Sequence, residues 1–63
     1  METSERFIGL TKRQSYTLAE RLNLIPHLVR MDERQLFGYP EDTRDDRVCL
    51  EFDERKVSRA TIQ

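Results

Sequence analysis

The chain has 63 residues, and its 11 basic and 12 acidic side chains leave a formal net charge of -1. A chain of this length buries only about 60% of its extended surface on folding, which allows one minimal core and excludes a second domain. The near balance of charge disfavours nucleic acid or another polyanion as a partner. So small a core also leaves little room for a walled catalytic cleft, so we expect no enzyme activity and no cofactor.

The N-terminal residues and the cysteine content indicate where the chain acts. Met1 to Glu5 lack the basic start of a secretory signal, and no apolar run long enough to span a membrane follows them. Cys49 is the only cysteine, which excludes an internal disulfide and fits a reducing compartment. We therefore expect a cytoplasmic protein that does not bind membranes, with a flexible N-terminus at residues 1–6 and a single domain at residues 7–63.

A capping box marks the start of one helix. Thr11 as N-cap and Gln14 three residues later can satisfy each other's free backbone donors, so the helix should begin at Lys12. We expect the helix to fray at Asn23, because Pro26 disfavours helical dihedral angles in the residue before it. The narrow apolar stripe of this helix, at helical spacing, is made of Ser15, Leu18, Ala19 and Leu22.

Three strands are predicted after the helix. Residues 27–31 are partly β-branched and suit a short strand. Residues 48–52 alternate, with three apolar side chains on one face, and form the clearest strand, which should be central. A polar turn then leads into residues 57–62, where the apolar alternation breaks phase once. A bulge near Ser58 or Arg59 would explain that shift.

A long loop is predicted between the first two strands. Asp32 to Asp46 has neither a sustained apolar period nor a helix signal, and Gly38 to Pro40 within it is typical of a turn. Such a segment is uncommon in a small domain unless it is functional or disordered. The element order predicts an α+β fold with the helix across one face of a small sheet. The expected core is apolar and consists of Phe7, Ile8, Leu18, Ala19, Leu22, Leu28, Val29, Val48, Leu50, Phe52, Val57 and Ile62.

No metal or catalytic constellation is visible. His27 and Cys49 each stand alone, and the carboxylates lack the spacing of a calcium loop. We expect His27 to be structural or on the surface, because a general base needs a nucleophile and an orienting partner nearby. Cys49 lies between two core-facing residues, so it belongs to the opposite face of the sheet as a semi-buried small hydrophobe.

The charged and aromatic residues of the loop leave alternatives open. The acidic pairs Glu41-Asp42 and Asp45-Asp46 are best interpreted as solvated charge. Arg44 and Arg47 flank the start of the central strand, where they either brace the loop or remain ordinary surface arginines. The apolar residues of the loop, which serve either partner contact or loop packing, are Leu36, Phe37 and Tyr39.

Three stretches of the chain resemble the potato inhibitor I family of serine protease inhibitors and its bacterial relatives. Phe7 to Thr11 is similar to the apolar pair, glycine and N-cap that precede the family's single helix. Thr43 to Asp53 resembles the family pattern of aromatic, Arg, any residue, Asp, Arg, Val or Leu, any residue, apolar, any residue, Val, Asp. Val57 to Ile62 fits the closing strand, so the resemblance covers most of the chain from Phe7 onward.

The resemblance implies a fold and an activity. The implied fold is a single helix packed on a small mixed sheet, with a long exposed protease-binding loop, residues 32–46, between the first two, parallel strands. Arg44 and Arg47 fall on the family's supporting arginines, which places the scissile bond between Glu41 and Asp42. Braced ends keep the cleaved peptide in place, so that hydrolysis reverses. The inhibitory or partner-binding residues are then Phe37, Tyr39, Pro40, Glu41, Asp42 and Thr43.

Three residues depart from the family pattern. Pro40 stands where the family has a hydroxyl residue that accepts a brace, Thr43 replaces an aromatic residue, and Cys49 replaces an arginine that is sometimes present. The expected function is protein binding, with a serine protease as the partner. The alternative is a non-inhibitory intracellular interaction module, which binds a protein through the loop or associates with itself through the edge strand at residues 57–62.

Overall fold

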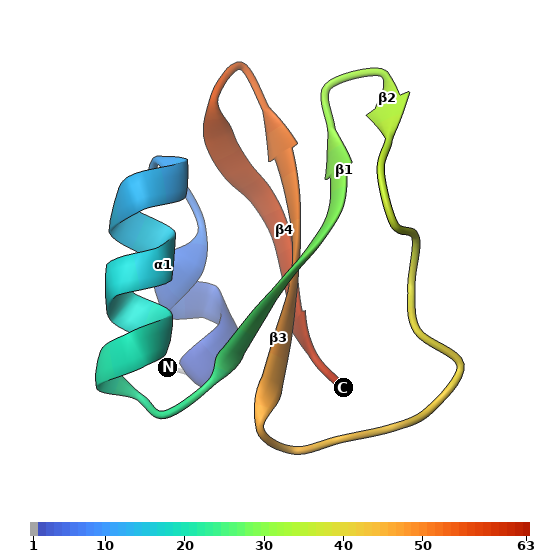
Figure 1. Cartoon of the computed structure of the whole chain (residues 1–63). Coiled ribbons are helices and arrows are strands. Elements are labelled where there is room, and N and C mark those ends of the chain that lie inside the picture. Colours follow the sequence, from blue (N-terminus) through green and yellow to red (C-terminus); the bar gives the residue numbers. More distant parts are fainter. Residues whose placement is uncertain (1) are drawn as a thin grey trace.

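The structure, a computed structural model that describes residues 2–63, consists of one α-helix beside a four-stranded mixed sheet, so the chain has an α+β fold (Figure 1). In chain order its elements are η1 (Thr3–Phe7, a 3-10 helix), α1 (Lys12–Arg21), β1 (Ile25–Met31), β2 (Arg34–Gln35), β3 (Arg47–Asp53) and β4 (Lys56–Ile62). The strands lie in the order β2-β1-β3-β4. The two inner strands, β1 and β3, are parallel, and each outer strand is antiparallel to its neighbour.

The helix begins where the capping box predicts. The Thr11 hydroxyl accepts a hydrogen bond from the Gln14 backbone N–H at 3.2 Å, and the Gln14 side chain accepts one from the Thr11 N–H at 3.0 Å. The helix ends at Arg21, close to the predicted position. Asn23 has a φ of 58°, a left-handed conformation that is common where helices end.

The central strand and the bulge are both confirmed. β3 lies between β1 and β4, and Val48, Leu50 and Phe52 are buried. In the ladder with β4, Glu51 pairs with Arg59 and Phe52 pairs with Val57, so that Ser58 is an extra residue in β4. The bulge restores the inward direction of the apolar residues on both sides of it.

β1 starts two residues earlier than the sequence predicts. It begins at Ile25 and includes Pro26, which lies opposite Val48 of β3. Proline lacks an N–H and is tolerated in a strand where no neighbour needs that donor. β2 pairs only with Arg30 and Met31, so the outer side of β1 has no partner strand at Pro26.

The main core lies between the sheet and the two helices. Its fully buried members are Phe7, Ala19, Val48, Leu50, Phe52 and Val57. The prediction that Ile8 belongs to the core is wrong, because Ile8 is 49% exposed at the end of η1. The sequence predicts no regular element before the α-helix, whereas η1 inserts Phe7 into the core. The flexible N-terminus predicted at residues 1–6 includes Met1, which lies outside the described residues.

The predicted loop of residues 32–46 is interrupted by a short strand. Arg34 and Gln35 of β2 pair with Met31 and Arg30 of β1, after a turn in which Asp32 has a φ of 55°. The first two strands are therefore antiparallel, and the parallel pair is β1 with β3. Residues 36–46, here called the 36–46 loop, have no regular structure and lead into β3. α1 and the 36–46 loop lie on opposite sides of the sheet (Figure 1).

Candidate functional site

The 36–46 loop is attached at both ends to the backbone of β1. Its first residue, Leu36, donates its N–H to the carbonyl of Val29 at 3.0 Å, and Gly38 donates to the same carbonyl at 3.4 Å. At the other end, the Ile25 N–H donates to the carbonyl of Asp46 at 2.7 Å. The two ends of the loop are thus held by the two ends of one strand, which limits the shapes that the loop can take.

Three side chains from the sheet face opposite α1 reach the loop. On β3, Val48, Leu50 and Phe52 belong to the core, and strand alternation turns Arg47 and Glu51 to the other face. His27 of β1 pairs with Cys49 and lies on that same face. The side chains that contact the loop are His27, Arg47 and Glu51.

His27 holds the start of the loop. Its Nε2 lies 2.8 Å from the carbonyl oxygen of Gly38, a distance at which a protonated Nε2 donates a hydrogen bond. Gly38 has a φ of +68°, which glycine adopts without strain. The His27 ring also packs at a tilt against Phe37, with 6.2 Å between the ring centroids. Phe37 is otherwise 76% exposed, so most of its ring is available to a partner.

Tyr39 is the second point of attachment. Its hydroxyl donates a hydrogen bond to Glu51, whose other carboxylate oxygen accepts from the Arg30 Nε at 2.9 Å. Burial, followed by the hydrogen bond to Glu51 and its negative charge, raises the pKa of the Tyr39 phenol. The Tyr39 hydrogen bond, followed by the bond from Arg30, lowers the pKa of Glu51. Glu51 is therefore a charged acceptor over a wide pH range.

Arg47 is the third point of attachment, and it contacts the backbone as well as the side chain of the loop. Its Nη2 donates to the Asp42 carbonyl at 2.9 Å and to the Asp42 carboxylate at 3.3 Å. Its Nε donates to the carbonyl of Gln63 at 2.8 Å. The Arg47 side chain is only 11% exposed, so the guanidinium is largely removed from water. The bond from Arg47 is also the main reason why the pKa of Asp42 is lowered.

Arg44 has a different role from Arg47. Its guanidinium forms two hydrogen bonds with the Asp46 carboxylate, at 2.8 and 2.9 Å, and both side chains are exposed. This pair lowers the pKa of Asp46 and raises that of Arg44, chiefly through the hydrogen bonds themselves. An exposed pair two residues apart connects the loop only to itself. Of the two arginines that sequence reasoning treats alike, Arg47 alone ties the loop to another strand.

The tip of the loop is left free between two attachments. Pro40 and Glu41 lie between Tyr39 and Asp42, the residues held by Glu51 and Arg47. Within residues 2–63, the side chain of Glu41 makes no hydrogen bond or ion pair, and it is exposed. The Glu41–Asp42 peptide bond is thus presented at the surface by a segment that is fixed on both sides.

Cys49 lies beneath this region and is chemically protected. It is fully buried, not semi-buried as the sequence predicts, and its Sγ lies 4.0 Å from the carbonyl of Gln63. Burial raises the pKa of the Cys49 thiol, which opposes formation of the nucleophilic thiolate.

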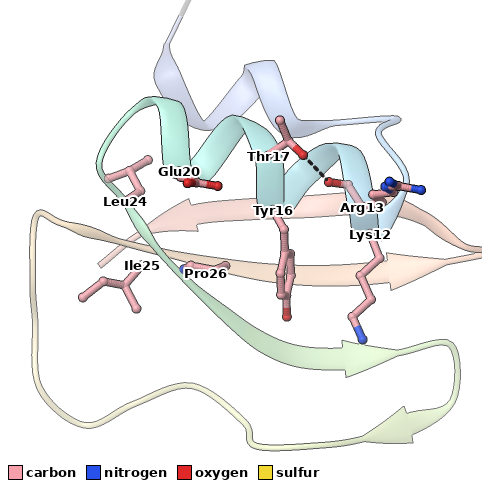
Figure 2. A pocket seen from close by; sticks show the side chains of 8 residues that line it. All are labelled: Lys12, Arg13, Tyr16, Thr17, Glu20, Leu24, Ile25 and Pro26. Atoms are coloured by element: carbon pink, nitrogen blue, oxygen red, sulfur yellow. Dashed lines mark hydrogen bonds between the residues drawn. The ribbon is translucent and has the colours of Figure 1, made fainter.

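An open groove between α1 and β1 is the other depression of interest (Figure 2). It has a volume of about 800 Å³ and is walled mainly by Tyr16, Leu24, Ile25 and Pro26. The Lys12 ammonium lies 5.8 Å from the centroid of the Tyr16 ring. Its charged and hydroxyl-bearing side chains, those of Lys12, Arg13, Thr17 and Glu20, all come from α1. The facing wall at Leu24, Ile25 and Pro26 is apolar, so polar groups do not converge from two sides on a small molecule. We therefore take the 36–46 loop as the candidate functional site.

Sequence reasoning missed two residues of this site. Glu51 and Gln63 are not singled out by any motif, although Glu51 is the one charged residue between the apolar residues of β3. Alternation could have shown that Glu51 faces away from the core, but not that it meets Tyr39. The sequence predicts that His27 is structural or on the surface, and its contact with the Gly38 carbonyl gives it a structural role at the loop.

Residues 2–63 contain no group of three side chains that could hold a metal ion. Within the same part of the chain, no helix is both long and apolar enough to cross a membrane. Comparison of the chain with protein-family models, with curated proteins and with solved structures found no match.

Proposed function

We propose that the chain binds a protein through the 36–46 loop, and that this partner is a serine protease which the loop inhibits. The observation that carries the proposal is the set of bonds from Arg47 to the Asp42 carbonyl and carboxylate. Arg47 belongs to β3, the central strand, so these bonds fix one residue of an exposed loop to the most buried part of the molecule. A segment held in this way is pre-organised for binding.

The attachment of Asp42 favours inhibition over digestion. A protease that cut the Glu41–Asp42 bond would create a new amino group on Asp42. Arg47 holds the carbonyl of that same residue, so the amino group would remain near the acyl group it had left. Two reacting groups kept in place recombine far faster than free ones, which favours resynthesis of the bond over release of product.

The charge of the tip indicates the kind of protease. Glu41 is exposed and would enter the pocket that selects the residue before the cleaved bond. A carboxylate is accepted only where a cationic group or several hydrogen-bond donors replace its water. The target that fits this tip is a protease that cleaves after glutamate.

The proposal is tested by incubating the protein with three serine proteases: one that is glutamate-specific, one chymotrypsin-like and one subtilisin-like. We expect tight, slow-off inhibition of the glutamate-specific enzyme, with only partial cleavage of the Glu41–Asp42 bond at equilibrium. A Glu41→Leu variant should lose this inhibition and gain inhibition of the subtilisin-like enzyme. Rapid, complete cleavage after Glu41 without inhibition of any of the three would refute the proposal.

A second candidate function is supported by a separate observation. β4 lies at the edge of the sheet. Within residues 2–63, the segment that pairs with its outer side is residues 9–11, which reach only its start at Lys56 and Val57. The Val57 N–H donates to the Leu10 carbonyl and the Val57 carbonyl accepts from the Gly9 N–H, both at 2.8 Å. The remainder of the strand, residues 58–62, can pair with another strand. Self-association through this edge would make the chain an interaction module. Sedimentation equilibrium over a range of concentrations tests it, and a monomer throughout would exclude it.

A further inference from the structure

We infer that Glu51 is a positioning residue for the first half of the 36–46 loop, and that it acts through the hydroxyl of Tyr39. This inference deepens the proposed function, on which its meaning for inhibition rests, because it names the groups that fix the residues before Glu41. The contact itself is direct: the Tyr39 hydroxyl donates to the Glu51 carboxylate. The Glu51 side chain is only 12% exposed, so little water competes for that carboxylate.

Glu51 is held rigidly from the other side. Arg30 donates from its Nε to Glu51 at 2.9 Å, and its two terminal nitrogens each donate to the Asp53 carboxylate at 2.9 Å. Arg30 also donates to the carbonyl of Asp32. A guanidinium with this many partners has a fixed position, and it fixes the carboxylate that it contacts. Tyr39 thus meets an acceptor whose place is set before the loop closes on it.

Pro40 restricts the backbone between this contact and the tip of the loop. The proline ring restricts its own φ to about -65°, and it also restricts the backbone of the residue before it. Once the Tyr39 side chain is held, fewer rotations remain between Tyr39 and Glu41 than in a chain without proline. Glu51 and Arg47 therefore hold the loop on either side of the Glu41–Asp42 bond. Glu51 accepts a hydrogen bond from Tyr39, whereas Arg47 donates to Asp42.

The competing explanation is that Tyr39 only packs against the sheet, so that its hydroxyl is incidental. Tyr39→Phe separates the two explanations, because it keeps the ring and removes only the hydroxyl. Glu51→Gln is the partner change, because it keeps the size of the side chain and removes its charge. Arg59→Ala is the matched control, because Arg59 forms only a long, exposed ion pair with Glu51, with 3.9 Å between its Nε and the carboxylate oxygen. Among residues 2–63, no hydrogen bond joins Arg59 to the loop.

The first measurement is the rate at which a glutamate-specific protease cuts the Glu41–Asp42 bond of the folded protein, followed by mass spectrometry. We expect Tyr39→Phe and Glu51→Gln to raise this rate about tenfold, as loss of a hydrogen bond to a charged group would. Arg59→Ala should leave it unchanged. A synthetic peptide of residues 36–46, with and without Tyr39→Phe, corrects for the effect of the substitution on the protease itself.

The second measurement does not depend on cleavage. The chain has two tyrosines and no tryptophan, so a Tyr16→Phe background leaves Tyr39 as the only phenol. Its phenolate absorbance should develop at lower pH when Glu51→Gln is added, because the neighbouring negative charge is gone.

The two measurements together decide between the explanations. Unchanged cleavage and an unchanged titration in Glu51→Gln would overturn the inference. It would also fail if Tyr39→Phe sped up cleavage only in proportion to a lower midpoint of urea denaturation. Faster cleavage in a protein that inhibits none of the three proteases would support the inference and refute the proposed function.

Discussion

Arg44 and Arg47 lie three residues apart, yet their surroundings give them different physical roles. The Arg44 guanidinium is paired with Asp46 in water, where an ion pair stabilises little because solvent and salt screen it. The Arg47 guanidinium is nearly buried and bonds to two backbone carbonyls, those of Asp42 and Gln63. Removal of Arg47 would leave those carbonyls without their partner.

We therefore expect Arg47→Ala to lower the free energy of unfolding by about 2 kcal/mol, as loss of hydrogen bonds to a charged group does. Arg44→Ala is the matched control and should leave the midpoint of urea denaturation unchanged. Both are measured by circular dichroism. Equal losses in the two variants would show that the distinction between them is wrong.

The residues of the site differ in how far the sequence predicts them. The position of Arg47 before an alternating strand is visible in the sequence, and so is the exposed tip at Glu41. The partners of Glu51 are not visible in the sequence, because Tyr39 and Arg30 lie 12 and 21 residues away from it in the chain. A contact of that kind depends on the path of the loop over the sheet, which no local pattern encodes.

At the scale of elements, the β3–β4 hairpin is strained at its turn. Glu54 and Arg55 have φ values of 52° and 68°, and they lie between Asp53 and Lys56, which pair across the strands. Two consecutive positive φ values are typical of a type I′ turn, for which Asn-Gly is the preferred sequence. A left-handed conformation costs an ordinary residue about 1–2 kcal/mol.

The double variant Glu54→Asn/Arg55→Gly should therefore raise the free energy of unfolding by about 1 kcal/mol. Both side chains are exposed, and the bond from the Glu54 backbone N–H to Asp32 is retained. Urea denaturation measures the change. A loss of stability would mean that the turn is not the source of strain.

The capping box of α1 gives a second test at this scale. Thr11→Ala removes the hydroxyl that accepts from Gln14 and should cost about 1 kcal/mol of unfolding free energy. Thr17→Ala is its control on the same helix, because the Thr17 hydroxyl only donates to the Arg13 carbonyl, which the helix already uses. Thermal denaturation of the two variants should separate them, and a loss in Thr17→Ala as large as that in Thr11→Ala would contradict this account.

Local patterns predict α1 and β3 well, because a capping box and an alternating strand are complete within a few residues. β2 has two residues, too few to show alternation, and it exists only because β1 offers it Arg30 and Met31. The early start of β1 at Ile25 likewise depends on pairing with β3. These elements are defined by their neighbours, so the sequence of the segment alone does not predict them.

At the scale of the whole molecule, the sheet is covered on both faces. α1 and η1 cover one face, and the 36–46 loop is bonded to His27, Arg47 and Glu51 of the other, so the loop is part of the folded structure. Carboxylates take part in several of the bonds in and around the loop. Hydrogen bonds from arginine or tyrosine lower the pKa of four of them: Asp42, Asp46, Glu51 and Asp53.

This charge arrangement predicts sensitivity to acid. A carboxylate whose pKa is lower in the folded state than in the unfolded state, where it is about 4, stabilises the fold above that value. The contribution is lost as the pH falls through the folded pKa. We expect the free energy of unfolding to fall from about pH 5 downward, and to fall less steeply in Glu51→Gln. Urea denaturation across this range measures it, and parallel curves would contradict the role of Glu51.

Arg47 joins two surfaces that otherwise look separate. Its guanidinium holds Asp42 in the loop and the carbonyl of Gln63, the residue that follows β4. A partner that draws Asp42 away breaks one hydrogen bond of the Arg47 guanidinium. A partner that pairs with the edge of β4 and shifts Gln63 breaks another bond of the same guanidinium. Affinities for two such partners are then linked, and by thermodynamic reciprocity each alters the other by the same factor. The loop and the edge strand would behave in binding as one coupled unit.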